Sequence, residues 1–111
     1  MNIKPILIEK KDNGQNLFIS FDDNSNFTIS SELLRVESPS ADIQGHGGPK
    51  VIVRNKSNVL IDQIEPVGNY AIRIIFSDNH SSGIFSWELL YDFGKNHDKY
   101  FEAYYNSLQF K

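Results

Sequence analysis

The chain has 111 residues, of which 40% are apolar and 13% aromatic. This length suits one globular core and is too short for two, so we predict a single domain over residues 1–111. The net charge is −3, and the 11 Lys and Arg residues are scattered, which argues against a surface for nucleic acid or anionic lipid. Because the chain has no cysteine, disulfides, thiol nucleophiles and cysteine-held metal or iron–sulfur centres are excluded.

Apolar segments along the chain are short. None approaches the apolar core of a signal peptide or the roughly 18 to 20 residues that span a bilayer. We therefore expect a cytoplasmic protein that makes no contact with membranes.

Turn signals and alternating apolar residues predict mostly antiparallel strands. Asp12-Asn13-Gly14 is a hairpin signal, and Pro5 indicates an edge strand. We expect strands over residues 3–9, 17–21, 27–29, 51–53, 59–64, 70–76 and 82–85. The last three of these, joined by tight turns that include Glu65 to Asn69, are expected at the centre of the fold. Residues 37–50 hold several Gly, Pro and small polar residues and predict a loop.

Helical structure is predicted in three places, each with a candidate cap. These caps are Ser30 or Ser31 for a turn over 31–35, Ser86 for a helix carrying Trp87, Gly94 as that helix's left-handed end, and Asp98 for the last helix. The fold class is therefore α+β: mostly antiparallel sheet with a short helical turn near 31–35 and two C-terminal helices. The many aromatic residues predict core, with room for one exposed interaction patch, since no basic residues interleave with them.

Residues that could carry chemistry lie mainly in loops. The run Gly45 to Lys50 differs from a phosphate loop because Pro-Lys-Val leads into a strand rather than a helix. Asp42, Glu65, Asp78 and Asp98 could join a histidine at a metal, but no spacing makes them converge with His46, His80 or His97. Hydrogen-bonded loop histidines are favoured, with His97 exposed. Ser38 or Ser40 near His46 or His80 could form a nucleophile–base pair, but neither lies in a nucleophile elbow.

Four strings in the chain carry a resemblance: Leu34 to Asp42, Gln44 to Gly47, Ile64 to Tyr70, and Gly83 to Tyr91. They resemble the bacterial domain family that is similar to the N-terminal domain of gamma-butyrobetaine hydroxylase. In those hydroxylases a separate oxygenase domain holds the iron and performs the reaction. The resemblance therefore implies the fold of the N-terminal domain without hydroxylase activity, and we expect this chain not to be an enzyme.

The resemblance also implies where a metal would lie. The hydroxylase domain binds zinc through three cysteines and one histidine, and these positions fall at Ser38, Ser40, Ile43 and His80. Neutral serine hydroxyls are poor zinc ligands, so we predict no structural zinc and no cofactor. Hydrogen bonds and turns are expected to hold the loop instead.

Relatives of this family occur together with P-loop proteins that carry iron–sulfur clusters. The resemblance thus implies a small interaction or adaptor domain with a protein partner, and an accessory role in iron–sulfur cluster maturation is one form of that function. The expected interaction surface comprises Arg35, Ser38, Ser40, His46, His80 and Trp87. The alternative is a small-ligand or metal-binding domain that uses His46 and His80 with Asp42 or Glu65. The sequence fixes neither the partner nor the oligomeric state.

Overall fold

The computed structural model describes residues 3–38, 58–81 and 83–109. Its strands are β1 (Pro5–Lys11), β2 (Asn16–Phe21), β3 (Asn26–Ser30), β4 (Ile61–Val67), β5 (Ala71–Phe76) and β6 (Ile84–Ser86). Its helices are the 3-10 turn η1 (Asp12–Gly14), α1 (Ser31–Val36), α3 (Trp87–Lys95) and α4 (His97–Gln109). The strands form two antiparallel three-stranded sheets, in the orders β1-β2-β3 and β4-β5-β6. This architecture confirms the predicted α+β class. The expected strand over 51–53 lies outside the described residues.

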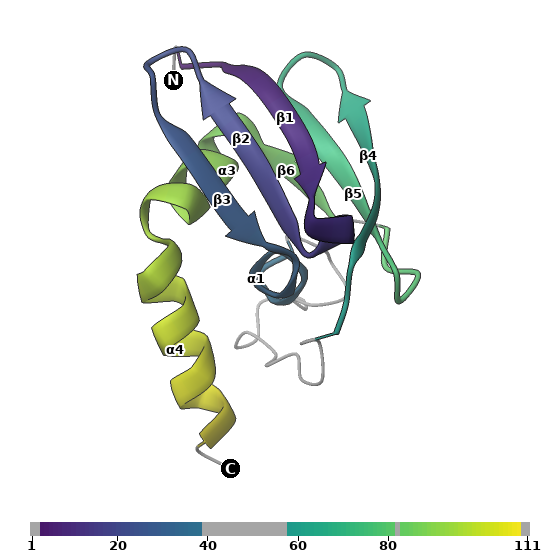
Figure 1. Cartoon of the computed structure of the whole chain (residues 1–111), viewed down its shortest axis with the longest axis vertical. Helices are drawn as coiled ribbons and strands as arrows, with labels where there is room; N and C mark the ends of the chain where they lie inside the picture. The colour runs from purple at the N-terminus through teal and green to yellow at the C-terminus, as the bar shows by residue number, and fades with distance from the viewer. Residues whose placement is uncertain (1–2, 39–57, 82, 110–111) are drawn as a thin grey trace, which may run out of the picture.

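The two sheets face each other, α1 lies at one end between them, and α3 and α4 lie on the β3 side (Figure 1). Each sheet turns alternate residues inward, as the two-residue period of a strand requires. The buried core consists of Leu17, Ile19, Phe21 and Ile29 from the first sheet, Ile61, Ile72, Ile74, Phe76 and Phe85 from the second, and Leu33, Leu34, Val36, Leu90 and Phe93 from the helices.

The turn between β1 and β2 also joins the two sheets. Asp12, Asn13 and Gly14 all have positive φ angles, which confirms the predicted turn. A Cβ atom on Gly14 would lie 2.4 Å from the carbonyl oxygen of Ile61 on β4, so any larger residue would clash with β4. Lys10 adds a second link, since its Nζ donates to the carbonyl of Asp62 at 3.3 Å.

Serine side chains begin two of the helices, as predicted. The Ser30 hydroxyl accepts the backbone N–H of Leu33 at 3.1 Å, and the Ser86 hydroxyl accepts that of Leu89 at 3.2 Å. Ser31, the alternative cap of α1, instead donates its hydroxyl to the carbonyl of Val59 at 2.6 Å. That buried bond ties α1 to the chain just before β4.

Several predicted element ends were wrong. Gly94 does not end α3: the helix runs on to Lys95, and a Cβ atom on Gly94 would lie 2.3 Å from the Phe27 ring, so this glycine permits close packing. The last helix begins at His97, which had been expected at its start, so Asp98 lies in the first turn and does not cap it. His97 is half-buried instead of exposed, because its Nε2 accepts the backbone N–H of Ser30 at 3.3 Å.

Strand β4 continues through Pro66 to Val67, where a turn had been expected. Proline is tolerated there because, among the described strands, β4 lies at the edge of its sheet and pairs with β5 alone. The turn follows at Gly68, which has a φ of +55°. Tyr70 precedes β5 and is 58% exposed, so it is not part of the strand that was predicted over 70–76. In the described part of the chain, no helix is long and apolar enough to cross a membrane.

Candidate functional site

Four polar side chains meet where α1 ends and β5 turns toward β6. We call them the Arg35–His80 cluster: Arg35, Ser38, Asp78 and His80. The Nε of Arg35 donates to Oδ2 of Asp78 at 2.8 Å, and Oδ1 of Asp78 accepts the backbone N–H of His80 at 3.2 Å. Oγ of Ser38 lies 3.0 Å from Nε2 of His80. The cluster therefore joins α1 to a turn that lies about 40 residues later in the chain.

Two residues of this cluster are closed to solvent, whereas Asp78 is exposed. Ser38 is 1% exposed and Arg35 is 9% exposed, while His80 is half-buried. Gly83 makes the closure possible, because a Cβ atom there would lie 2.1 Å from the Ser38 hydroxyl. Among the residues that the structure describes, the buried Nη1 of Arg35 has no hydrogen-bond partner. An acceptor at that point would remove the penalty of leaving this donor unpaired.

Of the zinc positions implied by the family, Ser40 and Ile43 lie outside the described residues, and the other two are hydrogen-bonded to each other rather than spaced as metal ligands. Ser38 and His80 are two of the four positions, and their polar atoms are 3.0 Å apart. Two ligands of one tetrahedral zinc, each about 2.0 to 2.3 Å from the ion, lie about 3.3 to 3.8 Å from each other. The shorter distance is that of a direct hydrogen bond. Residues 3–38, 58–81 and 83–109 contain no group of three or more His, Cys, Asp or Glu side chains suited to a metal.

The cluster contains a serine, a histidine and an aspartate, yet their arrangement is not that of a catalytic triad. In a triad the carboxylate accepts the second ring N–H of the histidine and orients the imidazole. Here one oxygen of Asp78 accepts the backbone N–H of His80 and the other binds Arg35. The hydroxyl of Ser38 is buried and lies against His80. The contacts suit a structural role.

Other predicted site residues are not part of this cluster. Ser40, Asp42, Ile43 and His46 lie outside the described residues. Glu65 is on β4, where it forms an ion pair with Arg73 at 3.5 Å. Its pairing position on β5 is three residues before Phe76, so the strand carries it roughly 10 Å from the turn that holds His80. The geometry does not bring Glu65 to His80.

Trp87 lies at the opposite end of β5 from the cluster. It follows Ser86, which pairs with Ala71, whereas the cluster follows Phe76 at the other end of the same strand. Six strand residues separate the two places by roughly 17 Å. The predicted surface that combined Arg35, His80 and Trp87 is therefore divided into two regions.

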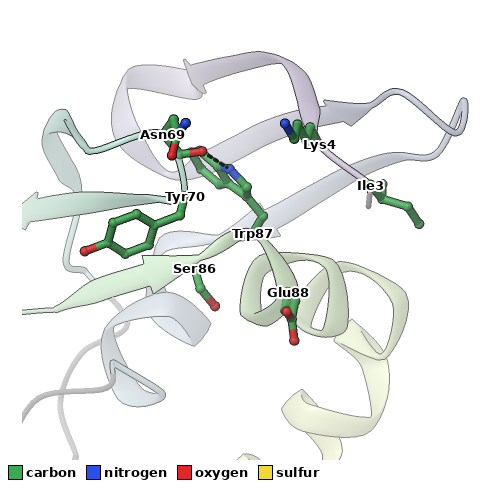
Figure 2. A pocket seen from close by; sticks show the side chains of 7 residues that line it. All are labelled: Ile3, Lys4, Asn69, Tyr70, Ser86, Trp87 and Glu88. Atoms are coloured by element: carbon green, nitrogen blue, oxygen red, sulfur yellow. Dashed lines mark hydrogen bonds between the residues drawn. The ribbon is translucent and has the colours of Figure 1, made fainter. Parts of the chain in front are cut away.

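Trp87 lines a cavity of about 330 Å³ that opens at the surface (Figure 2). We call this region the Trp87 surface; its residues are Ile3, Lys4, Asn69, Tyr70, Ser86, Trp87 and Glu88. They come from the segment before β1, the turn between β4 and β5, and the start of α3. Nε1 of Trp87 donates to the carbonyl oxygen of Asn69 at 2.9 Å, which fixes the indole against the turn. Tyr70 beside it is 58% exposed.

Sequence reasoning missed two features of these regions. Asp78 was considered as a metal ligand, but its pairing with Arg35 depends on a contact across 43 residues that no local pattern encodes. The turn residues of the Trp87 surface were also missed, although an aromatic residue directly after Gly68-Asn69 is a local signal for an exposed ring. The sequence instead predicts Tyr70 at the start of the strand expected over 70–76.

Comparison with known proteins identifies the family. None of the curated proteins matches the chain. Two proteins with structures determined by NMR in solution are similar over 96% of this chain: one is 45% identical over 80% of its own length with a TM-score of 0.81, and the other is 34% identical over 85% with a TM-score of 0.83.

A third structure is a crystal structure of a DUF971 family protein of unknown function from Acidithiobacillus ferrooxidans. It is 33% identical, covers 78% of this chain and 88% of that one, and has a TM-score of 0.66. The model of the family described as "Gamma-butyrobetaine hydroxylase-like, N-terminal" matches residues 8–91. The chain therefore belongs to the gamma-butyrobetaine hydroxylase-like N-terminal domain family.

Proposed function

We propose that this domain is a non-catalytic interaction module that docks a protein partner through the Trp87 surface. The observation that carries the proposal is the pairing of an immobilised indole with an exposed phenol ring. Trp87 is held by its bond to Asn69, and Tyr70 is 58% exposed although it is a large aromatic residue. Trp and Tyr are enriched at the energetic centres of protein interfaces, where rigid rings lose little entropy on binding.

The burial of Arg35 and Ser38 in the Arg35–His80 cluster supports the same proposal. Ser38 and Arg35 are buried, and each forms a hydrogen bond to the turn that holds Asp78 and His80, which supports a role in the fold. The exposed aromatic residues beside Trp87 are left as the better-placed contact surface.

The resemblance to the family suggests the class of partner. Relatives occur with P-loop carriers of iron–sulfur clusters, and we propose that such a carrier, or a protein that receives its clusters, binds here in the cytoplasm. The chain itself has no cysteine to hold a cluster. Its role in this proposal is accessory, as a docking domain during cluster delivery.

The test is capture of partners from the native cells with tagged protein and with two matched tyrosine variants. Tyr70→Ser removes the exposed ring of the Trp87 surface, while Tyr105→Ser removes a ring of α4 that is 47% exposed. We expect Tyr70→Ser to lose the partner and Tyr105→Ser to retain it, with circular dichroism confirming that both fold. Equal capture by the two variants would refute the assigned surface.

Metal content of the same eluate tests the alternative of a metal-binding domain. A stoichiometric metal that is lost in a His80→Ala variant, with no partner enriched, would replace the docking proposal by that alternative.

A further inference from the structure

We propose that the Trp87 surface takes a basic protein segment, which places an Arg or Lys side chain against the rings of Trp87 and Tyr70. This inference rests on the proposed docking function and names the chemistry of the partner. It follows from the fixed positions of the rings and from the charges that surround them.

Both rings are held in place before any partner binds. Trp87 is fixed through Nε1, so its N–H is already used and its π face is what remains for a ligand. The Tyr70 ring lies over Gly68, where a Cβ atom would be 2.8 Å from the ring carbon Cε1. Figure 2 shows both side chains beside the same cavity. Aromatic faces attract Arg and Lys cations, most strongly when the cation is partly desolvated.

The charges around the rings favour a cation from the partner. Glu88 lines the cavity and is exposed. Asp22 adjoins its wall, since Oδ1 of Asp22 accepts the backbone N–H of Lys4 at 3.2 Å. Asp23 follows Asp22 in the chain. Its Oδ2 accepts the hydroxyl of Tyr91 at 2.7 Å, and Tyr91 lies on α3 about one turn after Glu88.

The hydrogen bond from Tyr91 lowers the pKa of Asp23, so this carboxylate stays ionised at neutral pH. Glu88 and Lys4 line the cavity, and the carboxylates of Asp22 and Asp23 lie on the segment bonded to Lys4 and Tyr91, so three carboxylates and one ammonium belong to or adjoin the described lining. Such an excess of negative charge attracts a basic segment and repels an acidic one. The cavity of about 330 Å³ is at the lower end of ligand sites, which suits one long side chain.

The chain provides its own reporter for the test, because Trp87 is its only tryptophan. The experiment is a titration followed by Trp fluorescence, with acetyl-Gly-Arg-Gly-amide as the probe and acetyl-Gly-Glu-Gly-amide as the acidic control. We expect a saturable change with the Arg peptide in the millimolar range, as is typical of such small ligands, and none with the Glu peptide. Added salt should weaken the response.

Charge reversal then assigns the site. Glu88→Lys should weaken the response to the Arg peptide by about tenfold or more, whereas Glu102→Lys should not. Glu102 is an exposed glutamate on α4 outside the Trp87 surface, so this variant carries the same change of net charge. Glu88→Gln removes the charge without placing a cation at the start of α3, and it should show an intermediate loss.

The outcomes separate this inference from the docking proposal. If Tyr70→Ser abolishes partner capture while Glu88→Lys leaves both capture and peptide response unchanged, the docking surface holds and the basic partner is refuted. Equal responses to the Arg and Glu peptides would refute it as well. A fluorescence change that depends on protein concentration alone would assign the surface to a second copy of this chain and overturn the inference.

Discussion

Substitution of Ser38 by Ala tests whether the Arg35–His80 cluster stabilises the fold through hydrogen bonds. The hydroxyl is 1% exposed and lies 3.0 Å from Nε2 of His80. Leaving a buried polar atom without its partner costs about 1 to 3 kcal/mol. Because His80 is only half-buried, water can reach part of its ring, so we expect a loss of about 1 to 2 kcal/mol. For a domain of this size that lowers the midpoint of thermal unfolding by about 4 to 8 °C.

The assay is urea unfolding of a double-mutant cycle made of Ser38→Ala, His80→Phe and the double variant. The two residues are in direct contact, so their effects should be non-additive by about 1 kcal/mol. Ser81→Ala is the matched control, because Ser81 is an exposed serine next to His80 and should change stability by less than about 0.5 kcal/mol. Additive effects within about 0.3 kcal/mol would refute the proposed hydrogen bond.

Treatment of the unmodified protein with a chelator is a second test of the Ser38–His80 hydrogen bond. Since Ser38 and His80 contact each other directly, a chelator such as EDTA should leave the unfolding midpoint unchanged. A midpoint that falls with EDTA and recovers with Zn²⁺ would show that a metal, and not the hydrogen bond, holds this part of the fold.

Two further predictions concern α3 and α4. Gly94→Ala should destabilise the fold by about 1 to 2 kcal/mol in urea unfolding, since the new Cβ would lie 2.3 Å from the Phe27 ring and the strain exceeds the gain in helix propensity; a variant as stable as the parent would contradict this. The hydrogen bond from Tyr100 to the Asp92 carboxylate raises the pKa of Tyr100 to about 12. The stability that this bond provides is therefore complete below pH 10 and is lost as the pH rises from 10 to 12. After allowance for solvent screening, the contribution of this bond to the free energy of unfolding is about 1 kcal/mol. Urea unfolding of Tyr100→Phe should therefore show a smaller loss of stability between pH 9 and 12 than that of the parent protein. Equal losses would refute the assignment.

Local sequence signals predicted most of the elements, because their causes are local. The serine caps Ser30 and Ser86 and the alternation along β5 act within a few residues, and the structure confirms all three. The errors came from tertiary contacts. Gly94 has the sequence position of a left-handed cap, yet what requires a glycine there is Phe27, which lies 67 residues earlier.

Strand β4 is a second case in which tertiary structure overrides a local signal, and here the strand is longer than the local signal predicts. Pro66 and Gly68 together read as one turn, but the edge position of β4 tolerates the proline and moves the turn onward to Gly68. Strand β4 ends at Val67, three residues beyond its expected end, and Tyr70 lies in the turn that follows, exposed beside Trp87. An error in an element's end therefore concealed a part of the candidate site.

The two regions that the sequence merged have different physical characters, and this difference supports their separate roles. In the Arg35–His80 cluster, Ser38 and Arg35 are buried and form hydrogen bonds to His80 and Asp78, so changing them should alter stability before it alters binding. Tyr70 is exposed on a short turn, so its loss should alter binding and leave stability nearly unchanged. Ser38→Ala should therefore change unfolding and leave partner capture intact, whereas Tyr70→Ser should change partner capture and leave unfolding nearly intact. A Ser38→Ala variant that remains folded and yet loses the partner would join the two regions into one site again.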